Sequence, residues 1–438
     1  MNVSIHHWNQ LSAEERSTLL QRSQIDIGAL VETVRPVVEA VRDRGDEALC
    51  EYTARFDGVA LSPEAIAVPV EEFEAAEAAL DPSLRRALDY AIENVSRFHR
   101  AQVETADRSV QVREGIFATE RSTPIDSVGL YVPSGRGSFP SMMYMLAVPA
   151  VLAGVPTVAV TTPPRSDGTV DPAVLYAARQ CGVGAVYRVG GAQAVASLTW
   201  GTNTVPAVQK IVGPGSAYVA AAKRLVADHV DVGVPAGPSE SMVVADQSAD
   251  PWRVALDLMI EAEHGSDSSA VLVTPSASLA AAVVDTMQSL ISDVPQPRRT
   301  FLTDVFSSYG GVIVVHDLEQ AVAIVNDFAP EHLMLHTSEP RALASRITNA
   351  SEVLLGPHTA FSLANYATGP NAVLPTGGWA KSFGPVAVQD FQKRSTVIEV
   401  TATGYAEMRD HVVRLADHEG FFTHAAALRR RNEQSDRP

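Results

Sequence analysis

The chain has 438 residues, enough for two or three domains, and 46% of them are hydrophobic, so a large core is expected. A formal net charge of −17 argues against nucleic acid or an anionic membrane surface as a partner, although not against a small anionic substrate. The two cysteines, Cys50 and Cys181, are too few for a disulfide framework and favour a reducing compartment. Because neither a secretory signal nor an apolar stretch long enough to span a bilayer is visible, we expect a cytoplasmic protein.

The opening part of the chain is predicted to be helical. Apolar side chains recur at helical spacing between residues 25 and 41, with Pro36 as an interruption. Further helices are expected over 47–56, 68–79 and 82–100. This part of the sequence indicates no chemistry of its own.

From residue 128 onward, short β-branched runs alternate with helical ones. Four predicted strands are each followed by a turn rich in Gly or Pro and then by a helix: 128–132, 157–161, 185–189 and 210–212. A second set of strands is expected at 241–245, 270–274, 312–315 and 333–335. Repeated strand–turn–helix units predict parallel, doubly wound sheets, and hence an α/β protein. From Lys381 the chain is expected to be mixed and then helical.

The adjacent pair Glu331 and His332 lies at a predicted helix-to-strand turn, after Ala329-Pro330 and before an apolar run. A carboxylate beside an imidazole supplies two proton carriers that titrate in different ranges. The alternative interpretation is a surface glutamate next to a capping histidine.

Glu261 and His264 are three residues apart on one predicted helix, so they share a face. Such a pair is a recurring way to present a carboxylate and an imidazole to a metal, although an exposed last helical turn is the alternative. A metal needs further ligands from elsewhere, and spacing cannot choose among the candidates. These candidates are His358, Asn365, His418 and His424.

Three glycine-rich turns, at 190–191, 213–215 and 237–239, could present backbone N–H groups to a phosphate or carboxylate. None of them is a dinucleotide-binding fingerprint, and plain tight turns are the alternative. Ligands are expected at the carboxyl ends of the parallel strands. Arg136, in the loop after the first strand of this set, could clamp an anion or simply be solvated.

Several short motifs run in order along nearly the whole chain. They are Arg44-Gly-Asp46 with Tyr52-Thr-Ala-Arg-Phe-Asp-Gly58; Ile92-Glu-Asn94 with Phe98-His99; Val128-Gly-Leu-Tyr-Val-Pro133; Gly190-Gly-Ala-Gln-Ala194; Gly213-Pro-Gly215; Pro235-Ala-Gly-Pro-Ser-Glu240; Ala262-Glu-His-Gly265; Ala329-Pro-Glu-His-Leu333; and Asp390-Phe-Gln-Lys-Arg394. With these motifs the chain resembles the histidinol dehydrogenase family.

The resemblance implies an intertwined homodimer with two Rossmann-like domains and small helical domains at the N- and C-termini. The domain boundaries expected on this basis are an N-terminal segment at 1–24, a first α/β domain formed by 25–127 and 240–382, an NAD-binding domain at 128–239, and a C-terminal dimerisation and active-site tail at 383–438. It also implies NAD as the hydride acceptor, one Zn²⁺ per active site, and a small-molecule alcohol as substrate.

The resemblance also implies roles for single residues. His332 would take the proton of the alcohol, and Glu331 would activate the water that hydrates the aldehyde. The other implied contacts are Tyr131, Gln193 and the position of Ser216 for NAD; Ser239, Glu419 and the position of Ala372 for the substrate; and Glu261, His264, Asn365 and His424 for the metal. Arg136, a further candidate for the substrate, adds a cation where the family usually has small neutral residues.

The chain departs from the family pattern at several of these positions. The family has Gln at position 261 and Asp at position 365, so the two exchanges together preserve one carboxylate and one amide. It has a substrate-contacting His at Ala372, an acidic residue at Phe361, and Asn at Ser216. Losing a His and an acid removes partners for the imidazole and amine of histidinol.

The departures lead us to expect an NAD- and zinc-dependent dehydrogenase acting on another small polar alcohol. A hydroxy acid or a sulfonated diol is the preferred substrate class, because some relatives that oxidise sulfonated diols resemble this chain in placing an arginine at the position of Arg136. Histidinol dehydrogenase itself is one alternative, and a non-catalytic binding protein with a decayed site is the other.

Overall fold

The structure is a computed structural model that describes residues 3–22, 27–104, 107–134 and 137–431. The chain forms two units, one from Met1–Gln102 with Ile125–Phe391 and the other from Val103–Pro124 with Gln392–Pro438. A search of the described residues finds no helix long and apolar enough to cross a membrane.

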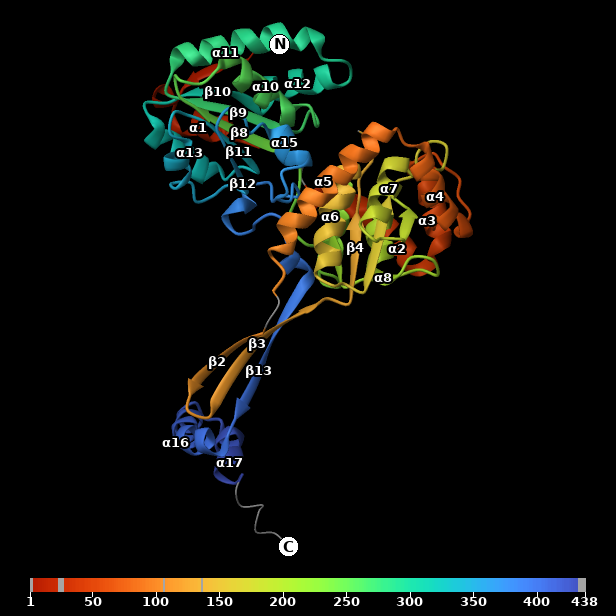
Figure 1. Cartoon of the computed structure of the whole chain (residues 1–438), viewed down its shortest axis with the longest axis vertical. Coiled ribbons are helices and arrows are strands. Elements are labelled where there is room, and N and C mark those ends of the chain that lie inside the picture. The colour runs from red at the N-terminus through yellow and green to blue at the C-terminus, as the bar shows by residue number, and fades with distance from the viewer. Residues whose placement is uncertain (1–2, 23–26, 105–106, 135–136, 432–438) are drawn as a thin grey trace. The chain divides into compact units, whose positions relative to one another are not determined.

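The larger sheet of the first unit has six strands in the order β1-β10-β9-β8-β11-β12, all parallel (Figure 1). The strands are β1 (Ile5–His7), β8 (Glu240–Ala245), β9 (Ser269–Thr274), β10 (Gly310–Val314), β11 (His332–His336) and β12 (Glu352–Leu355). The second set of predicted strands is therefore confirmed. The two edge strands, β1 and β12, were not predicted.

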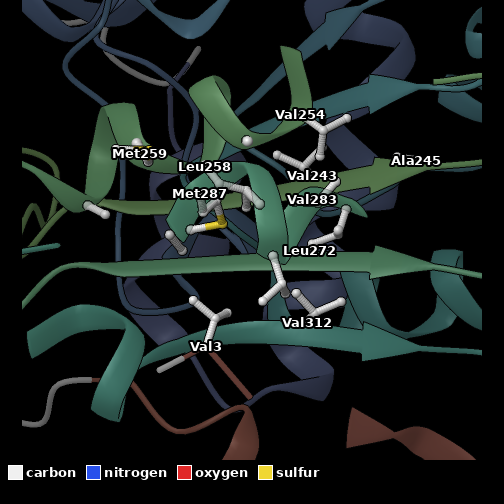
Figure 2. Close-up of a cluster of buried hydrophobic side chains, with 14 of the residues drawn as sticks. Val3, Val243, Ala245, Val254, Leu258, Met259, Leu272, Val283, Met287 and Val312 are labelled. Atoms are coloured by element: carbon white, nitrogen blue, oxygen red, sulfur yellow. The ribbon is translucent and has the colours of Figure 1, made fainter. Parts of the chain in front are cut away.

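Helices cover both faces of this sheet. One face packs against α10 (Pro251–Ala262), α11 (Ala277–Leu290) and α12 (Arg298–Ser308) through a continuous apolar cluster. Figure 2 shows this cluster, in which Leu258 and Val254 of α10 lie with Val243 and Leu272 of the strands. The opposite face packs against α13 (Leu318–Phe328) and α14 (Pro340–Ala344). Burial on both faces explains why these strands appear in the sequence as continuous apolar runs.

The second sheet of the first unit has four parallel strands in the order β6-β5-β4-β7. The strands are β4 (Ser127–Tyr131), β5 (Thr157–Thr162), β6 (Val186–Arg188) and β7 (Lys210–Val212). The connecting helices are α6 (Pro140–Leu152), α7 (Pro172–Gln180), α8 (Gly191–Trp200) and α9 (Ala217–Val226). This confirms the doubly wound arrangement expected for residues 128–239.

The N-terminal helices differ from their predicted grouping. They are α1 (Ala13–Leu19), α2 (Ile27–Arg44), α3 (Asp46–Phe56), α4 (Val70–Ala79) and α5 (Pro82–Arg100). We expected 25–127 to join 240–382, but α2 and α3 share a core with α8 and α9, while α4 and α5 pack on α7 and α6. The apolar periodicity of these helices predicts that each has a buried face, but it does not predict which sheet that face packs against.

The N-terminal segment, predicted to be helical over 1–24, also differs. It contributes the strand β1, whose Ile5 pairs with Val312 of β10, before α1 begins. A strand of three residues is too short to show a periodic pattern, so the sequence could not reveal it.

The second unit is built on a three-stranded antiparallel sheet in the order β13-β3-β2. Its strands are β2 (Arg108–Arg113), β3 (Ile116–Pro124) and β13 (Gln392–Val400), followed by α16 (Ala402–His418) and α17 (Phe422–Arg429). The strands β2 and β3 were not predicted, whereas the expectation of a mixed and then helical segment from Lys381 is confirmed by β13, α16 and α17. Every residue of β2 is exposed, so burial left no signal in its sequence.

Candidate active site

The pair Glu331 and His332 lies where α13 gives way to β11, as the sequence predicts. The helix ends at Phe328, Ala329 adopts a left-handed conformation with φ 54°, and the strand starts at His332. Both side chains of the pair are buried, with residue exposures of 7% for Glu331 and 3% for His332. The interpretation as a surface glutamate and a capping histidine is therefore wrong.

Carboxylates surround the imidazole of His332. Its Nδ1 lies 2.9 Å from Oε2 of Glu352, and its Nε2 lies 3.8 Å from Oε1 of Glu331 and 3.9 Å from Oε1 of Glu261. Burial alone lowers the pKa of His332, but the charges of Glu261 and Glu331 and the hydrogen bond with Glu352 outweigh it and raise the pKa to about 10. The carboxylates around it therefore stabilise the imidazolium that forms when His332 accepts a proton.

Glu331 is held by the backbone of the neighbouring strand. Its Oε2 accepts a hydrogen bond of 2.8 Å from the N–H of Glu240, the first residue of β8. Burial raises the pKa of Glu331 to about 8, against the lowering effect of His332. The buried carboxylate of Glu240 is in turn paired with Arg22, whose Nε lies 2.6 Å from its Oε1. Arg22 also donates to the carbonyl of Phe328, at the end of α13.

The predicted metal ligands Glu261, His264 and Asn365 lie together. Oε1 of Glu261 accepts a hydrogen bond of 2.7 Å from Nδ2 of Asn365, and its Oε2 lies 3.2 Å from Nδ1 of His264. Glu261 is the penultimate residue of α10, and Asn365 belongs to α15 (Phe361–Tyr366). Burial raises the pKa of Glu261, but the charges of His332 and His264 and the amide of Asn365 bring the pKa below its ordinary value.

These three side chains bring one carboxylate, one imidazole and one amide to the same point; the carboxylate and the imidazole are ordinary zinc ligands, and the amide is a weaker one. Among the described residues no group of three or more His, Cys, Asp or Glu side chains forms a possible metal site. The group here has an amide, from Asn365, as its third member. The carboxylate and the imidazole therefore fit a zinc ion, which would take further ligands from elsewhere.

The site lies at the amino ends of the parallel strands. Glu240, His332 and Glu352 are the first residues of β8, β11 and β12. The turn at 237–239 directly precedes β8, so it does not lie at the carboxyl end of that strand. The positions of the strands could be predicted from the sequence, but the edge of the sheet at which the site residues lie could not.

The predicted NAD contacts lie instead at the carboxyl ends of the second sheet. Tyr131 ends β4, and its hydroxyl accepts a hydrogen bond of 3.1 Å from the N–H of Gly191, at the start of α8. Gln193 is fully buried, and within the described residues neither atom of its amide has a hydrogen-bond partner. Such an orphaned amide fits a polar ligand, because burying it unpaired is costly.

The third NAD position, Ser216, is the N-cap residue of α9, and its side chain makes no capping hydrogen bond. The preceding turn contains Gly213 with φ 123°, where a Cβ would lie 2.2 Å from the carbonyl of Tyr131. The turn therefore brings backbone close to the end of β4, next to a helix N-terminus that favours anions. This geometry fits a dinucleotide.

The remaining predicted positions fall in several places. Ser239 is half-buried before β8, and Ala372 is half-buried next to Asn371, whose amide donates to the carbonyl of Met145 at 2.6 Å. Arg136 lies outside the described residues. Glu419 and His424 belong to the second unit, at the end of α16 and on α17, and both are exposed.

Phe361 has a distinct environment. It is fully buried at the start of α15, and its ring lies edge-on to the imidazole of His332 with 5.7 Å between ring centroids. An apolar side chain therefore borders the imidazole at a position where the resemblance implies an acid.

Sequence reasoning missed three residues around the site: Arg22, Glu240 as a contact of Glu331, and Glu352. It also missed the buried pair of Asp257 and His336, in which His336 lies at the carboxyl end of β11. Nε2 of His336 lies 2.7 Å from Oδ2 of Asp257, which is one turn before Glu261 on α10. The spacing of Asp257 and Glu261 on one helix face could have suggested Asp257. Glu240 and Glu352 approach the site through strand pairing, which the sequence does not show.

Comparisons with known proteins show the family of the chain. The family model of histidinol dehydrogenase matches residues 20–432. A histidinol dehydrogenase of Synechocystis is 46% identical over 423 residues, covering 97% of this chain and 98% of the relative. A histidinol dehydrogenase homolog of Cereibacter sphaeroides is 47% identical over 421 residues, covering 96% of each. The crystal structure of histidinol dehydrogenase from Elizabethkingia anophelis superposes with a TM-score of 0.92 at 33% identity, covering 100% of this chain and 99% of that one.

Fold, site and matches together define an NAD-dependent oxidoreductase that acts on CH–OH groups. The chain belongs to the histidinol dehydrogenase family. This family uses NAD and Zn²⁺, and the donor sets described above suit both.

Proposed function

We propose that the chain oxidises a small polar primary alcohol to the aldehyde, and the aldehyde on to the carboxylate, at the site around Glu331 and His332. The supporting observation is the buried imidazole of His332, whose Nδ1 is bonded to one carboxylate while its Nε2 faces Glu331 and Glu261. Two groups that can accept protons, held side by side in this way, suit two successive proton transfers.

Each residue of the pair has a separate role in this proposal. Nε2 of His332 takes the hydroxyl proton of the alcohol as hydride leaves the carbon. Glu331 takes a proton from the water that adds to the aldehyde carbon, and the resulting hydrate loses a second hydride to give the carboxylate. Two NAD molecules, bound in succession, would accept the two hydrides, and a zinc ion held by Glu261, His264, Asn365 and His424 would polarise the substrate. Tyr131, Gln193 and Ser216 contact the nucleotide, and Ser239 and Glu419 contact the substrate.

A substrate other than L-histidinol is supported by the surroundings of His332. Phe361 is buried against the imidazole, and Ala372 has no polar side chain. A site that leaves the polar groups of a substrate unpaired discriminates strongly against it. A hydroxy acid or a sulfonated diol needs no acidic partner, and Arg136 is the cation that we propose for its anionic group.

L-Histidinol itself is the second candidate, and the comparisons favour it over the first. It is the substrate to which the names of the relatives point, at 46% identity for the Synechocystis enzyme, and the matches extend over nearly the whole chain. On this alternative, other groups of the site replace the missing His and acid.

The test is NADH formation by the purified protein with L-histidinol and with matched hydroxy acids and sulfonated diols, beside elemental analysis for zinc. We expect about one zinc per chain and turnover of an anionic alcohol with little or none of L-histidinol. Brisk turnover of L-histidinol would favour the second candidate. No NAD reduction with any alcohol would contradict the dehydrogenase proposal as a whole and favour a non-catalytic binding protein.

A further inference from the structure

The side chain of Glu352 makes a contact with His332 that the roles above do not use. Its Oε2 lies 2.9 Å from Nδ1 of His332, and the two side chains are 12% and 4% exposed. The pairing follows from the sheet, because His332 and Glu352 lie opposite each other in the parallel register of β11 and β12. The N–H of Glu352 also donates to the carbonyl of Glu331 at 3.1 Å, so backbone and side chain together fix this contact.

The contact dictates where the imidazole carries its proton. An ionised carboxylate only accepts hydrogen bonds, so Nδ1 of His332 must donate. In the neutral ring Nε2 is then the nitrogen with a free lone pair. That nitrogen faces Glu331 and Glu261, the side from which the proposed reaction draws its proton.

The ring of His332 is also restrained on a further side. The edge-on contact with Phe361 leaves little room for the imidazole to turn over. A ring flip would break the hydrogen bond between Nδ1 of this imidazole and the side chain of Glu352.

We propose that Glu352 is a positioning residue that holds His332 in the tautomer and orientation in which Nε2 accepts the substrate proton. This inference rests on the proposed role of His332 as the base. Glu352 acts only through His332 and contacts neither substrate nor cofactor. A second carboxylate that orients an imidazole is a recurring device where one ring nitrogen must stay unprotonated.

The test compares two replacements of nearly equal size with a surface control. Glu352→Gln keeps an oxygen that accepts the hydrogen bond, whereas Glu352→Met fills the same space without an acceptor. Glu319→Met removes a glutamate from the exposed start of α13, where it pairs with Arg346. For each purified variant, kcat and KM for the preferred alcohol, KM for NAD, zinc content and thermal stability are measured.

We expect Glu352→Met to lower kcat by about 100-fold, with both KM values and the zinc content within about twofold of wild type. Glu352→Gln should stay within about tenfold of wild-type kcat, because the neutral bond is weaker than the charged one but keeps the same geometry. Glu319→Met should match wild type.

The proposal is overturned if Glu352→Met keeps wild-type kcat, or if Gln and Met at this position lower kcat equally. It is also overturned if zinc content falls together with kcat, since Glu352 would then support the metal instead. If Glu352→Met does not fold, the same decision rests on kcat of Glu352→Gln against Glu352→Ala. Failure of the proposed function is seen separately, as wild-type protein that reduces no NAD with any alcohol.

Discussion

The two neighbouring residues at the start of β11 have different surroundings, and this separates their roles. Glu331 is held through the backbone N–H of Glu240, whereas His332 is held through the side chain of Glu352. A change at one position therefore need not displace the other. The two oxidation steps of the proposed reaction can be tested separately.

Glu331→Gln is expected to preserve alcohol oxidation and to slow aldehyde oxidation by about 100-fold or more. The amide oxygen of Gln still accepts from the N–H of Glu240, but an amide is no base for the attacking water, and general-base catalysis contributes on the order of 10²–10⁴-fold. NADH formation is measured with the alcohol and, separately, with the aldehyde, while a carbonyl-trapping reagent reports aldehyde release. Equal slowing of the two steps would contradict the separate roles.

Single residues also show how far the sequence could be used to predict the site. The adjacency of Glu331 and His332, and the spacing of Glu261 and His264, are local, so both pairs could be identified before the fold was known. Glu352 and Glu240 approach the same point only because β12 and β8 flank β11 in register. No spacing along the chain encodes those contacts.

At the scale of elements, buried strands could be predicted and exposed or very short ones could not. All residues of β8 and β9 are buried, and their β-branched and aliphatic runs were visible in the sequence. In contrast, β13 is exposed over most of its length and pairs with β3, which lies far away in sequence. Pairing between distant segments is decided by tertiary structure, which local propensity does not contain.

The turn between β7 and α9 leads to a prediction about stability. Lys223 of α9 is buried, and its Nζ donates a hydrogen bond of 2.7 Å to the carbonyl of Gly213. Burial lowers its pKa to about 8, against the raising effect of Asp231. The unfolded chain keeps this proton up to an ordinary lysine pKa of about 10.4, so between these values it binds more protons than the folded chain. Stability contributed through Lys223 therefore rises with pH in this window.

We expect the stability difference between wild type and Lys223→Met to shift in favour of wild type as the pH rises from about 8 to about 10. Below pH 8 both states of the wild type hold the proton, so the difference should be constant there. Urea-unfolding midpoints at a series of pH values measure the effect, with Lys381→Met as a control at an exposed lysine paired with Asp327. If the urea-unfolding midpoints of wild type and Lys223→Met changed with pH in parallel, the lowered pKa of Lys223 would be contradicted.

At the scale of the whole molecule, the predicted site residues are divided between the two units. Glu331, His332, Glu261, His264 and Asn365 belong to the first unit. Glu419 and His424, which the family resemblance assigns to the same site, belong to the second. The homodimer implied by that resemblance provides a way to test whether one subunit supplies residues to the active site of the other.

Two inactive variants, His332→Asn and His424→Asn, are expected to restore activity when they are co-expressed. If each site takes His332 from one subunit and His424 from its partner, a mixed dimer has one site with both histidines intact. NADH formation by mixed dimers, purified through two different affinity tags, is compared with each variant alone. Mixed dimers as inactive as either parent would mean that His332 and His424 of one site come from the same chain.

The placement of the site at the amino ends of the larger sheet has an electrical consequence. Glu261 and the pair Glu331-His332 lie at or directly after the C-termini of α10 and α13, where aligned backbone carbonyls provide partial negative charge. The positions proposed for the dinucleotide lie at the N-termini of α8 and α9, where the backbone is partially positive. The edge of the larger sheet therefore has a partially negative backbone environment that favours cations and proton transfer, and the edge of the second sheet has a partially positive one that favours anions. Protein engineers could therefore alter cofactor preference through the loops of the second sheet while leaving the proton chemistry of the first untouched.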